Sequence, residues 1–401
     1  MTEHRPEVAD VFRAHEKDFL ARWGNVLSPQ QRKAFNDISD CRTAALGGHI
    51  DECDQCGHRV ISYNSCRNRN CPKCQAAARA EWLAERSAEL LPVEQYFHVV
   101  FTLPQEIAAL ALQNGREIYN LLFRSSSETL LKIAADPKHL GASIGFLAVL
   151  HTWGQNLHLH PHLHCVVPGG GISPDGLRWI DCRKSFFLPV KVLSRLFRKK
   201  FLLYLKKAFR KGKLRFHGEL EALARPSAFE AFCQRVGQKE WVVYAKPPFG
   251  GPEQTLKYLA RYTHRVAISN RRIVSLEDGR VTFTLRDYAD GNKTKTMTLE
   301  AVEFIRRFLV HVVPRGFVRI RHFGFLANRS RKEKLALCRA LLASQCAVAC
   351  SSLTSENASS DAAAEERNRC PVCKIGRLLL VETVLADPFR GSSALIGQDT
   401  S

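Results

Sequence analysis

Apolar and polar residues alternate in the middle of the chain, and this alternation predicts strands. The clearest runs are YFHVVFTL at 96–103, IGFLAVLHTW at 144–153 and HLHCVV within the segment 160–167. A helical repeat at 115–135 separates the first run from the second. Short connections and hairpins of this kind favour an α+β domain on a central antiparallel sheet flanked by helices.

The same reading predicts helices on both sides of these strands. Residues 1 to about 48 have helical patterns, and Ser28 is a suitable N-cap. The stretch TLEAVEFIRRFLVHVV, residues 298–313, predicts a helix that ends before Pro314. Between these regions, RVAISNRRIVSLEDGRVTFTLRDY predicts a hairpin that turns at an Asp-Gly pair, residues 278–279. A further helix is expected at 75–91.

Three regions follow from these patterns. Residues 1–92 form a helical and zinc-binding, DNA-binding domain, and residues 93–335 form the domain built on the sheet. Residues 336–401 contain a C-terminal helix, a linker and half of a zinc knuckle. The linker, 351–368, is small and polar, so we expect it and the last dozen residues to be flexible.

The charge of the chain points to a polyanionic partner. Its 401 residues carry 59 Lys and Arg against 39 Asp and Glu, a net charge of +20. Such an excess favours nucleic acid over neutral metabolites. The chain begins with charged residues and lacks a membrane-length apolar stretch, so we expect a cytoplasmic protein that joins the bacterial nucleoid when bound to DNA, with no membrane partner.

Fourteen cysteines in a reducing compartment suggest metal ligands rather than disulfides. Two Cys-x2-Cys pairs, Cys53 with Cys56 and Cys71 with Cys74, lie fourteen residues apart, which predicts one structural Zn²⁺ site. Three nearby residues offer alternatives that we do not expect to be ligands, namely Cys66, His49 and His58.

A third Cys-x2-Cys pair, Cys370 with Cys373, is half of another such site. Cys346 and Cys350 offer a partner pair, but three residues separate them and the linker intervenes. Whether this pair binds metal stays open at the level of sequence.

Five histidines precede a glycine turn between residues 151 and 164. Side chains alternate along a strand, so His162 and His164 share a face and form a two-imidazole clamp for a cation. His151, in the preceding strand, is the best candidate for a third ligand. Other possible third ligands are His158, His160 and Gln155. A divalent cation held by neutral imidazoles keeps its charge for polarising a phosphate oxygen.

Two tyrosines offer a nucleophile for that phosphate. Tyr258 and Tyr262 are four residues apart in a helical context, so both hydroxyls project from one face. Such a pair is usually packing, and a phenol needs an activated phosphate to attack. The tyrosines therefore matter only together with the histidine clamp.

Basic segments supply candidate DNA contacts. The stretch 191–213 has ten Lys or Arg and no acid, above an apolar stripe. A second stretch, 315–332, interleaves arginine with phenylalanine. The cations we expect to contact DNA are Arg67, Arg69, Lys199, Lys200, Lys257, Arg261 and Arg265.

Three motifs in order, SCRNRNCPKCQ, HTWGQNLHLHPHLHCVVPGGG and YLARYTHRVAISNRRI, resemble the rolling-circle transposases of the insertion sequence 91 family, the two-tyrosine branch of the HUH nucleases. The match covers nearly all of residues 20 to 335. The resemblance implies an N-terminal zinc-binding domain and an HUH endonuclease domain with Tyr258 and Tyr262 as nucleophiles. One departure is Asn70, where the family's motif leads us to expect histidine.

The resemblance also implies an activity. Each tyrosine would attack single-stranded DNA at an element end, with Mg²⁺ or Mn²⁺, giving a 5′-phosphotyrosyl link and a free 3′-OH. The chain lacks a P-loop motif, so we expect a host helicase and replication proteins as partners. Two alternatives stay open: a replication initiator or relaxase with the same chemistry, and a non-catalytic zinc-dependent DNA-binding protein.

Overall fold

A five-stranded antiparallel sheet organises the computed structural model, which describes residues 5–75, 82, 89–183, 187–250, 254–255, 266–287, 290–346 and 369–387. Its strand order is β12-β4-β5-β3-β8. The strands are β3 (Gln95–Thr102), β4 (Gly145–Trp153), β5 (Leu159–Pro168), β8 (Val243–Gly250) and β12 (Ile320–Gly324). The α+β class and the central antiparallel sheet expected from the sequence are confirmed.

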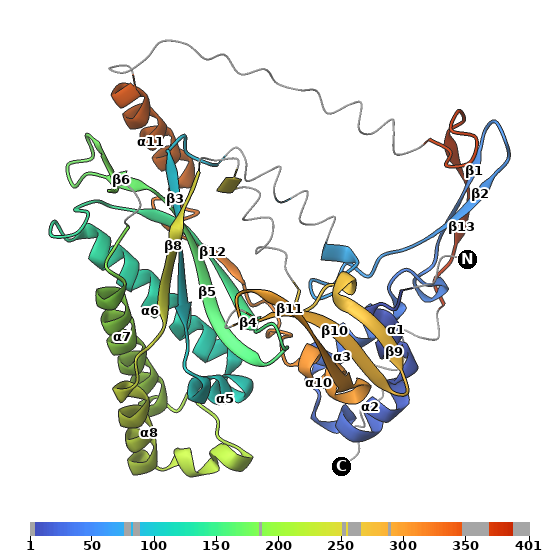
Figure 1. Ribbon diagram of the computed structural model, residues 1–401, viewed down its shortest axis with the longest axis horizontal. Helices are drawn as coiled ribbons and strands as arrows, with labels where there is room; N and C mark the ends of the chain where they lie inside the picture. The colour runs from blue at the N-terminus through green and yellow to red at the C-terminus, as the bar shows by residue number, and fades with distance from the viewer. Residues whose placement is uncertain are drawn as a thin grey trace, which may run out of the picture.

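Helices cover one face of this sheet (Figure 1). They are α5 (Gln105–Gln113), α6 (Gly115–Ala135), α7 (Val190–Arg210) and α8 (Pro226–Gln238). Odd-numbered side chains of β3 and β5, such as Phe101 and Leu163, enter this core, as do even-numbered ones of β4, such as Leu150. Because side chains alternate along a strand, the intervening residues point to the opposite face.

The opposite face is only partly covered by a second apolar layer. Helix α11 (Arg331–Cys346) places Leu335, Cys338 and Leu342 against Leu147 and Val166 of the sheet. The histidines of β4 and β5 lie on this same face, because they share the parity of these two residues.

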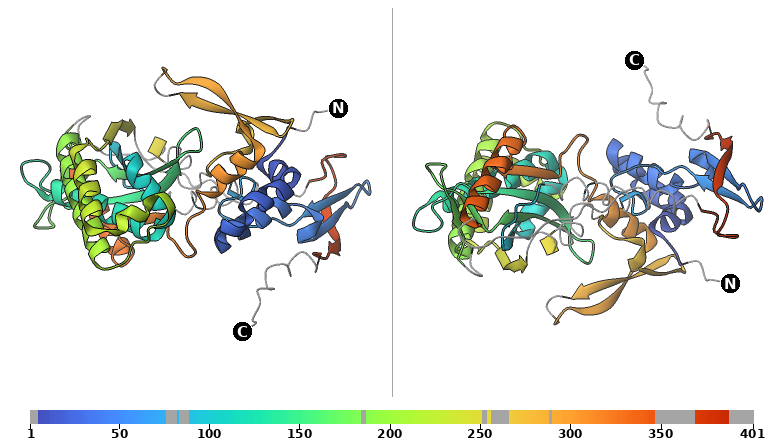
Figure 2. Two further views of the ribbon diagram at one scale, coloured as in Figure 1. Left: turned by 90° about the horizontal axis from the view of Figure 1, so that it is seen from below. Right: turned by 90° about the horizontal axis from the view of Figure 1, so that it is seen from above.

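A separate core joins the first helices to a late part of the chain. Helices α1 (Val8–Ala14), α2 (Glu16–Trp23) and α3 (Pro29–Asp40) pack with α10 (Ala301–Leu309) and the sheet β11-β10-β9, as Figures 1 and 2 show. The strands are β9 (Ile273–Glu277), β10 (Arg280–Asp287) and β11 (Lys293–Glu300). The rings of Phe12 and Phe308 meet edge to face at 5.3 Å. This core therefore draws residues from both sides of the boundary expected at 92/93.

A third sheet has the order β13-β1-β2 and combines the two ends of the described chain (Figure 1). Its strands are β1 (Gly48–Cys53), β2 (Arg59–Tyr63) and β13 (Leu378–Val384). The remaining short elements are β6 (Gly170–Ile172), β7 (Trp179–Asp181) and 3-10 turns at Gly24–Val26, Ala44–Leu46, Gly218–Ala224 and Asn270–Arg272. No helix of the described residues is long and apolar enough to cross a membrane.

Several local predictions have clear outcomes. Ser28 caps α3 by accepting a hydrogen bond from the Gln31 amide, and the β9–β10 hairpin turns at Asp278 and Gly279, both with positive φ. The helix expected at 298–313 was wrong at both ends, because Thr298 belongs to β11 and pairs with β10, and α10 ends at Leu309. Outside the described residues lie most of the expected helix at 75–91, the linker at 351–368 and all of the last dozen residues. Residues 89–91 are described and are not helical, so the helix expected at 75–91 was wrong at its end.

Candidate metal centre

Three imidazoles converge on the sheet face opposite helices α5, α6, α7 and α8, where His151 and His164 are buried and His162 is half-buried. One ring nitrogen from each of His151, His162 and His164 lies within 4.8 Å of the others. This is the arrangement expected from the sequence, including the choice of His151 as the third member. His158 and His160 do not belong to the group.

Strand pairing explains this convergence. In the register of β4 with β5, His151 lies directly opposite His162, and Val149 lies opposite His164. Cross-strand partners point to the same face, so His151 projects beside His162 and His164 of β5. The ring centroids are correspondingly close, with 5.6 Å between His151 and His162 and 4.4 Å between His151 and His164.

Neighbouring groups fix the orientation of two of the rings. The Nδ1 of His162 is 2.6 Å from the carbonyl oxygen of His160, so Nδ1 carries the proton and donates it. The ring's lone pair is then on Nε2, an atom through which imidazole binds metals. His98 of β3 contacts His164, with Nε2 of His98 2.8 Å from Nδ1 of His164. A cation on Nε2 of His164 would require its Nδ1–H to donate to His98.

His98 is fully buried, and no sequence motif marks it as part of the site. Its only signal was its place in the run YFHVVFTL, where one polar residue interrupts apolar ones. The pairing of β3 with β5 brings it next to His164, and the two rings stack with centroids 5.0 Å apart.

The end of β4 packs beside the site, and the loop after it is held in place. Trp153 stacks on His151 with centroids 4.7 Å apart. Buried His311 holds this loop, because its Nε2 donates to the Leu157 carbonyl at 3.1 Å and its Nδ1 lies 3.2 Å from the Thr152 hydroxyl. Burial lowers the pKa of His311 to about 4, so this imidazole is neutral at physiological pH.

The expected nucleophiles Tyr258 and Tyr262 lie outside the described residues, as do Lys257, Arg261 and Arg265. The chain after them is described from residue 266. Ala267 and Ile268 pack in the same core as Trp153 and Leu157.

The expected single zinc site of Cys53, Cys56, Cys71 and Cys74 was wrong in its pairing. The structure places the two Cys-x2-Cys pairs in different clusters, because each pair meets cysteines from elsewhere in the chain. Cys71 and Cys74 lie with Cys41, at the end of α3, and with Cys66.

The cluster of Cys41, Cys66, Cys71 and Cys74 has the dimensions of a tetrahedral thiolate site. Cys74 Sγ is 3.6 Å from the sulfurs of both Cys41 and Cys66. Asn70 is not a member, and its amide instead donates to the side chain of Asn68. Hydrogen bonding from Cys66 stabilises the thiolate form of Cys41, so the pKa of Cys41 lies well below its usual range.

The other pair, Cys53 with Cys56, meets Cys370 and Cys373. Of the alternative partners, the side chain of Cys346 and all of Cys350 lie outside the described part of the structure. His49 and His58 also belong to neither cluster.

Comparison with known proteins decides the family. A family model described as "Transposase zinc-binding domain", of the insertion sequence 91 type, matches residues 11–103, and one described as "Putative transposase" matches residues 145–334. The chain is 56% identical to "Putative transposase y4qJ" of Sinorhizobium fredii over 386 residues, which cover 95% of this chain and 96% of the relative. The chain belongs to the insertion sequence 91 family of transposases.

A more distant relative of this transposase carries an insertion-sequence name. The "Transposase for insertion sequence element IS801" of Pseudomonas savastanoi pv. phaseolicola is 28% identical over 296 residues, which cover 72% of this chain and 68% of the relative. No solved structure matches the chain. The zinc-binding domain of the family, together with the thiol clusters, supports structural zinc.

The cations expected to contact DNA in this transposase differ in their surroundings. The Arg69 guanidinium donates to the carbonyl oxygens of Phe317 at 2.7 Å and Pro314 at 3.2 Å, and burial lowers its pKa. Lys200 is ion-paired with Glu128 at 2.6 Å. Arg67 and Lys199 are exposed, so their charges face solvent.

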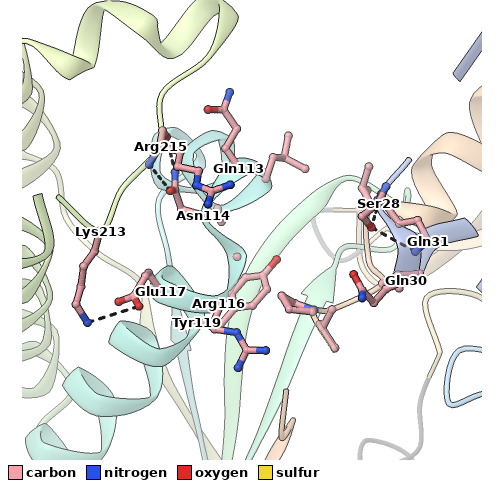
Figure 3. Close-up of a pocket in the computed structure, with 17 residues that line it drawn as sticks. Ser28, Gln30, Gln31, Gln113, Asn114, Arg116, Glu117, Tyr119, Lys213 and Arg215 are labelled. Carbon is pink, nitrogen blue, oxygen red and sulfur yellow. Dashed lines mark hydrogen bonds and ion pairs between the residues drawn. The ribbon is translucent and has the colours of Figure 1, made fainter. Parts of the chain in front are cut away.

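A polar cavity of the described transposase lies away from the histidines. It has a volume of about 350 Å³ and opens between the start of α3, the junction of α5 with α6, and residues 213–215 (Figure 3). Its lining includes Arg116, Lys213 and Arg215, but none of the three histidines. The histidine group is therefore separate from this cavity.

Proposed function

We propose that the transposase cuts and rejoins single-stranded DNA at element ends through 5′-phosphotyrosyl intermediates, as in rolling-circle transposition. The observation that carries this proposal is the convergence of His151, His162 and His164 on one face of the sheet, each with a ring nitrogen near the others. Three imidazoles whose nitrogens converge in a transposase have the chemistry to bind a cation next to a DNA phosphate.

The donor set fits a divalent cation. Three imidazole nitrogens lie within 4.8 Å of one another, and the Nδ1 of His162 is engaged by a backbone carbonyl, as is usual for metal-binding histidines. Of the two catalytic ions we propose, Mg²⁺ and Mn²⁺, this nitrogen-rich set favours Mn²⁺, because Mg²⁺ prefers oxygen ligands. When bound, the cation would draw negative charge from a non-bridging phosphate oxygen.

We propose Tyr258 and Tyr262 as the nucleophiles. In each cleavage the phenolic oxygen bonds to phosphorus, the bond to the 3′ oxygen breaks, and that oxygen takes a proton to become the 3′-OH. The phosphodiester energy is kept in the phosphotyrosyl bond, so attack by a 3′-OH reverses the step and rejoins DNA. Two tyrosines allow two strands to be held covalently at once.

The position of the following segment supports this assignment. Ala267 and Ile268 share a core with Trp153, whose ring stacks on His151, and Arg272 donates to the Gln155 carbonyl at 2.6 Å. Tyr262 precedes this segment by four residues in the sequence.

DNA binding would rest on exposed cations and on the zinc-binding domain. We propose Arg67, Lys199, Lys257, Arg261 and Arg265 as phosphate contacts, whereas Arg69 and Lys200 are held by protein groups. Strand displacement would come from a host helicase and replication proteins, in the cytoplasm at the nucleoid.

A labelled single-stranded oligonucleotide carrying an element end, incubated with Mn²⁺, tests the proposal. We expect a protein-linked DNA band that resists denaturant, and loss of the band in Tyr258→Phe plus Tyr262→Phe and in His162→Ala plus His164→Ala. Tyr63→Phe and His158→Ala, at exposed positions outside the histidine group, are the matched controls and should keep the band.

The other outcomes separate the alternatives. A gel shift without any covalent band in the unmodified chain would contradict the enzyme and support a zinc-dependent DNA-binding protein. Cleavage at a single site without joining to a second labelled oligonucleotide would support a replication initiator or relaxase. Mass spectrometry that finds the DNA on neither tyrosine would refute their role.

A further inference from the structure

A second cluster of four thiols connects the two ends of the described chain. Cys53 and Cys56 come from the tip of the β1–β2 hairpin, and Cys370 and Cys373 precede β13. The family models match residues 11–103 and 145–334, so neither includes the second pair. We infer that these four cysteines bind a structural Zn²⁺ that clips the C-terminal segment onto the N-terminal zinc-binding domain.

The spacing of the sulfur atoms fits a tetrahedral zinc site. Cys53 Sγ lies 3.7 Å from Cys373 Sγ, and Cys56 Sγ lies 3.7 Å from Cys370 Sγ. Zinc–sulfur bonds of about 2.3 Å place the corners of a tetrahedron about 3.8 Å apart. Two disulfides would instead need sulfur–sulfur distances of about 2 Å. The group consists of thiols alone among the described residues, which favours zinc over harder cations.

The backbone around each pair forms a knuckle that supports its thiolates. The amide of Gln55 points to Cys53 Sγ at 3.5 Å, and the amide of Gly376 points to Cys373 Sγ at 3.3 Å. The residue after each pair, Gly57 or Lys374, has a positive φ that turns the chain back. The two knuckles therefore share one geometry, although one lies near each end of the chain.

Gly376 packs the two knuckles against each other. A Cβ added there would lie 2.4 Å from Cys53 Sγ and 2.6 Å from Asp54 Oδ1. A backbone hydrogen bond also links the two knuckles at this point, because the Asp54 amide donates to the Arg377 carbonyl at 3.1 Å. Only glycine allows this approach, so position 376 is adapted to contact with the N-terminal knuckle.

Hydrophobic burial does not explain why β13 stays on β1. Its apolar side chains Leu379, Leu380 and Val381 are each more than half exposed. Among the described residues, no member of β13 belongs to any of the three apolar cores. A small sheet without a buried face is marginally stable, whereas zinc binding contributes directly to folding. The metal would therefore supply most of the attachment.

Metal analysis of the full-length chain tests the site. A His162→Ala plus His164→Ala background keeps the histidine group from adding an ion. We expect about two zinc ions per chain, one for each thiol cluster, and about one after Cys370→Ser plus Cys373→Ser. Cys182→Ser, outside both clusters, is the matched control and should keep two. Two ions in the Cys370→Ser plus Cys373→Ser protein would overturn the inference.

A cleavage assay tests the clip itself and does not depend on that variant folding. A specific protease site is placed between residues 351 and 368, and the cut chain is run on a gel-filtration column. We expect the C-terminal fragment to co-elute with the rest of the chain. We expect it to separate after a chelator removes zinc, and also in a Gly376→Val variant. Separation by reductant alone would indicate disulfides. Co-elution that survives chelation would refute the zinc clip.

The outcome is independent of the strand-transfer proposal. The clip assay reads metal content and fragment retention, whereas the covalent DNA band reads the histidines and tyrosines. Loss of one signal with retention of the other assigns the failure to one proposal.

Discussion

The buried imidazole of His311 should make the stability of the transposase depend on pH. His311 is 4% exposed and holds the loop after β4 through the Thr152 hydroxyl and the Leu157 carbonyl. Burial lowers its pKa from 6.5 to about 4, with the positive charge of protonated His158 as a minor further cause. Folding therefore favours the neutral ring.

The sign and size follow from linkage. A histidine whose folded pKa is depressed contributes its full stability above about pH 6.5 and loses it as the pH falls toward the folded pKa. For a shift from 6.5 to about 4, the change between about pH 7.5 and about pH 5 is about 2 kcal/mol of unfolding free energy.

Urea denaturation of the wild type and of His311→Gln measures this effect. Glutamine does not titrate, so other groups that protonate in this range cancel in the difference. We expect the variant to be less stable near neutral pH, because its packing and hydrogen bonds are worse. The difference in unfolding free energy between the wild type and the variant should narrow by about 2 kcal/mol toward pH 5. A gap that stays constant would refute the account of His311 as a neutral buried ring.

Three further changes test other contacts. His98→Phe should weaken Mn²⁺ binding about 10- to 100-fold in calorimetry, with partial rescue by His98→Gln; unchanged affinity would contradict its role in orienting His164. Arg69→Ala should cost about 2 kcal/mol in urea denaturation with little loss of DNA affinity, whereas Arg67→Ala should show the reverse. Gly279→Ala should lower stability by about 1 kcal/mol, because φ is +70° there; a neutral result would argue against this turn.

Local periodicity predicted much of the fold. The alternating runs predicted β3, β4 and β5 within a few residues. Because the second and third runs are consecutive in the sequence, they also predicted that His151 lies near His162, its partner in the β4–β5 register. The Asp-Gly turn at 278–279 also follows from local backbone preference. These features depend on residues close together in sequence, or on strands that are consecutive.

The features that sequence missed depend on long-range topology. The Cys-x2-Cys spacing correctly marks knuckles, but it does not say which knuckles meet; Cys41 has no local partner, and Cys370 is over 300 residues from Cys53. His98 reaches His164 only through the register of β3 with β5. Arg69 looks like a surface cation in sequence, and only the placement of Phe317 shows where its donors go.

The shared core of α1 and α10 bears on how the protein is made. Phe12 packs on Phe308, so the first helix completes its burial only after nearly 300 more residues have been synthesised. At about 5 to 20 residues per second, α1 waits for roughly 15 to 60 s on the ribosome with its apolar face uncovered. A chain truncated before α10 would leave that face without its partner, which makes incomplete translation products candidates for chaperone binding and degradation.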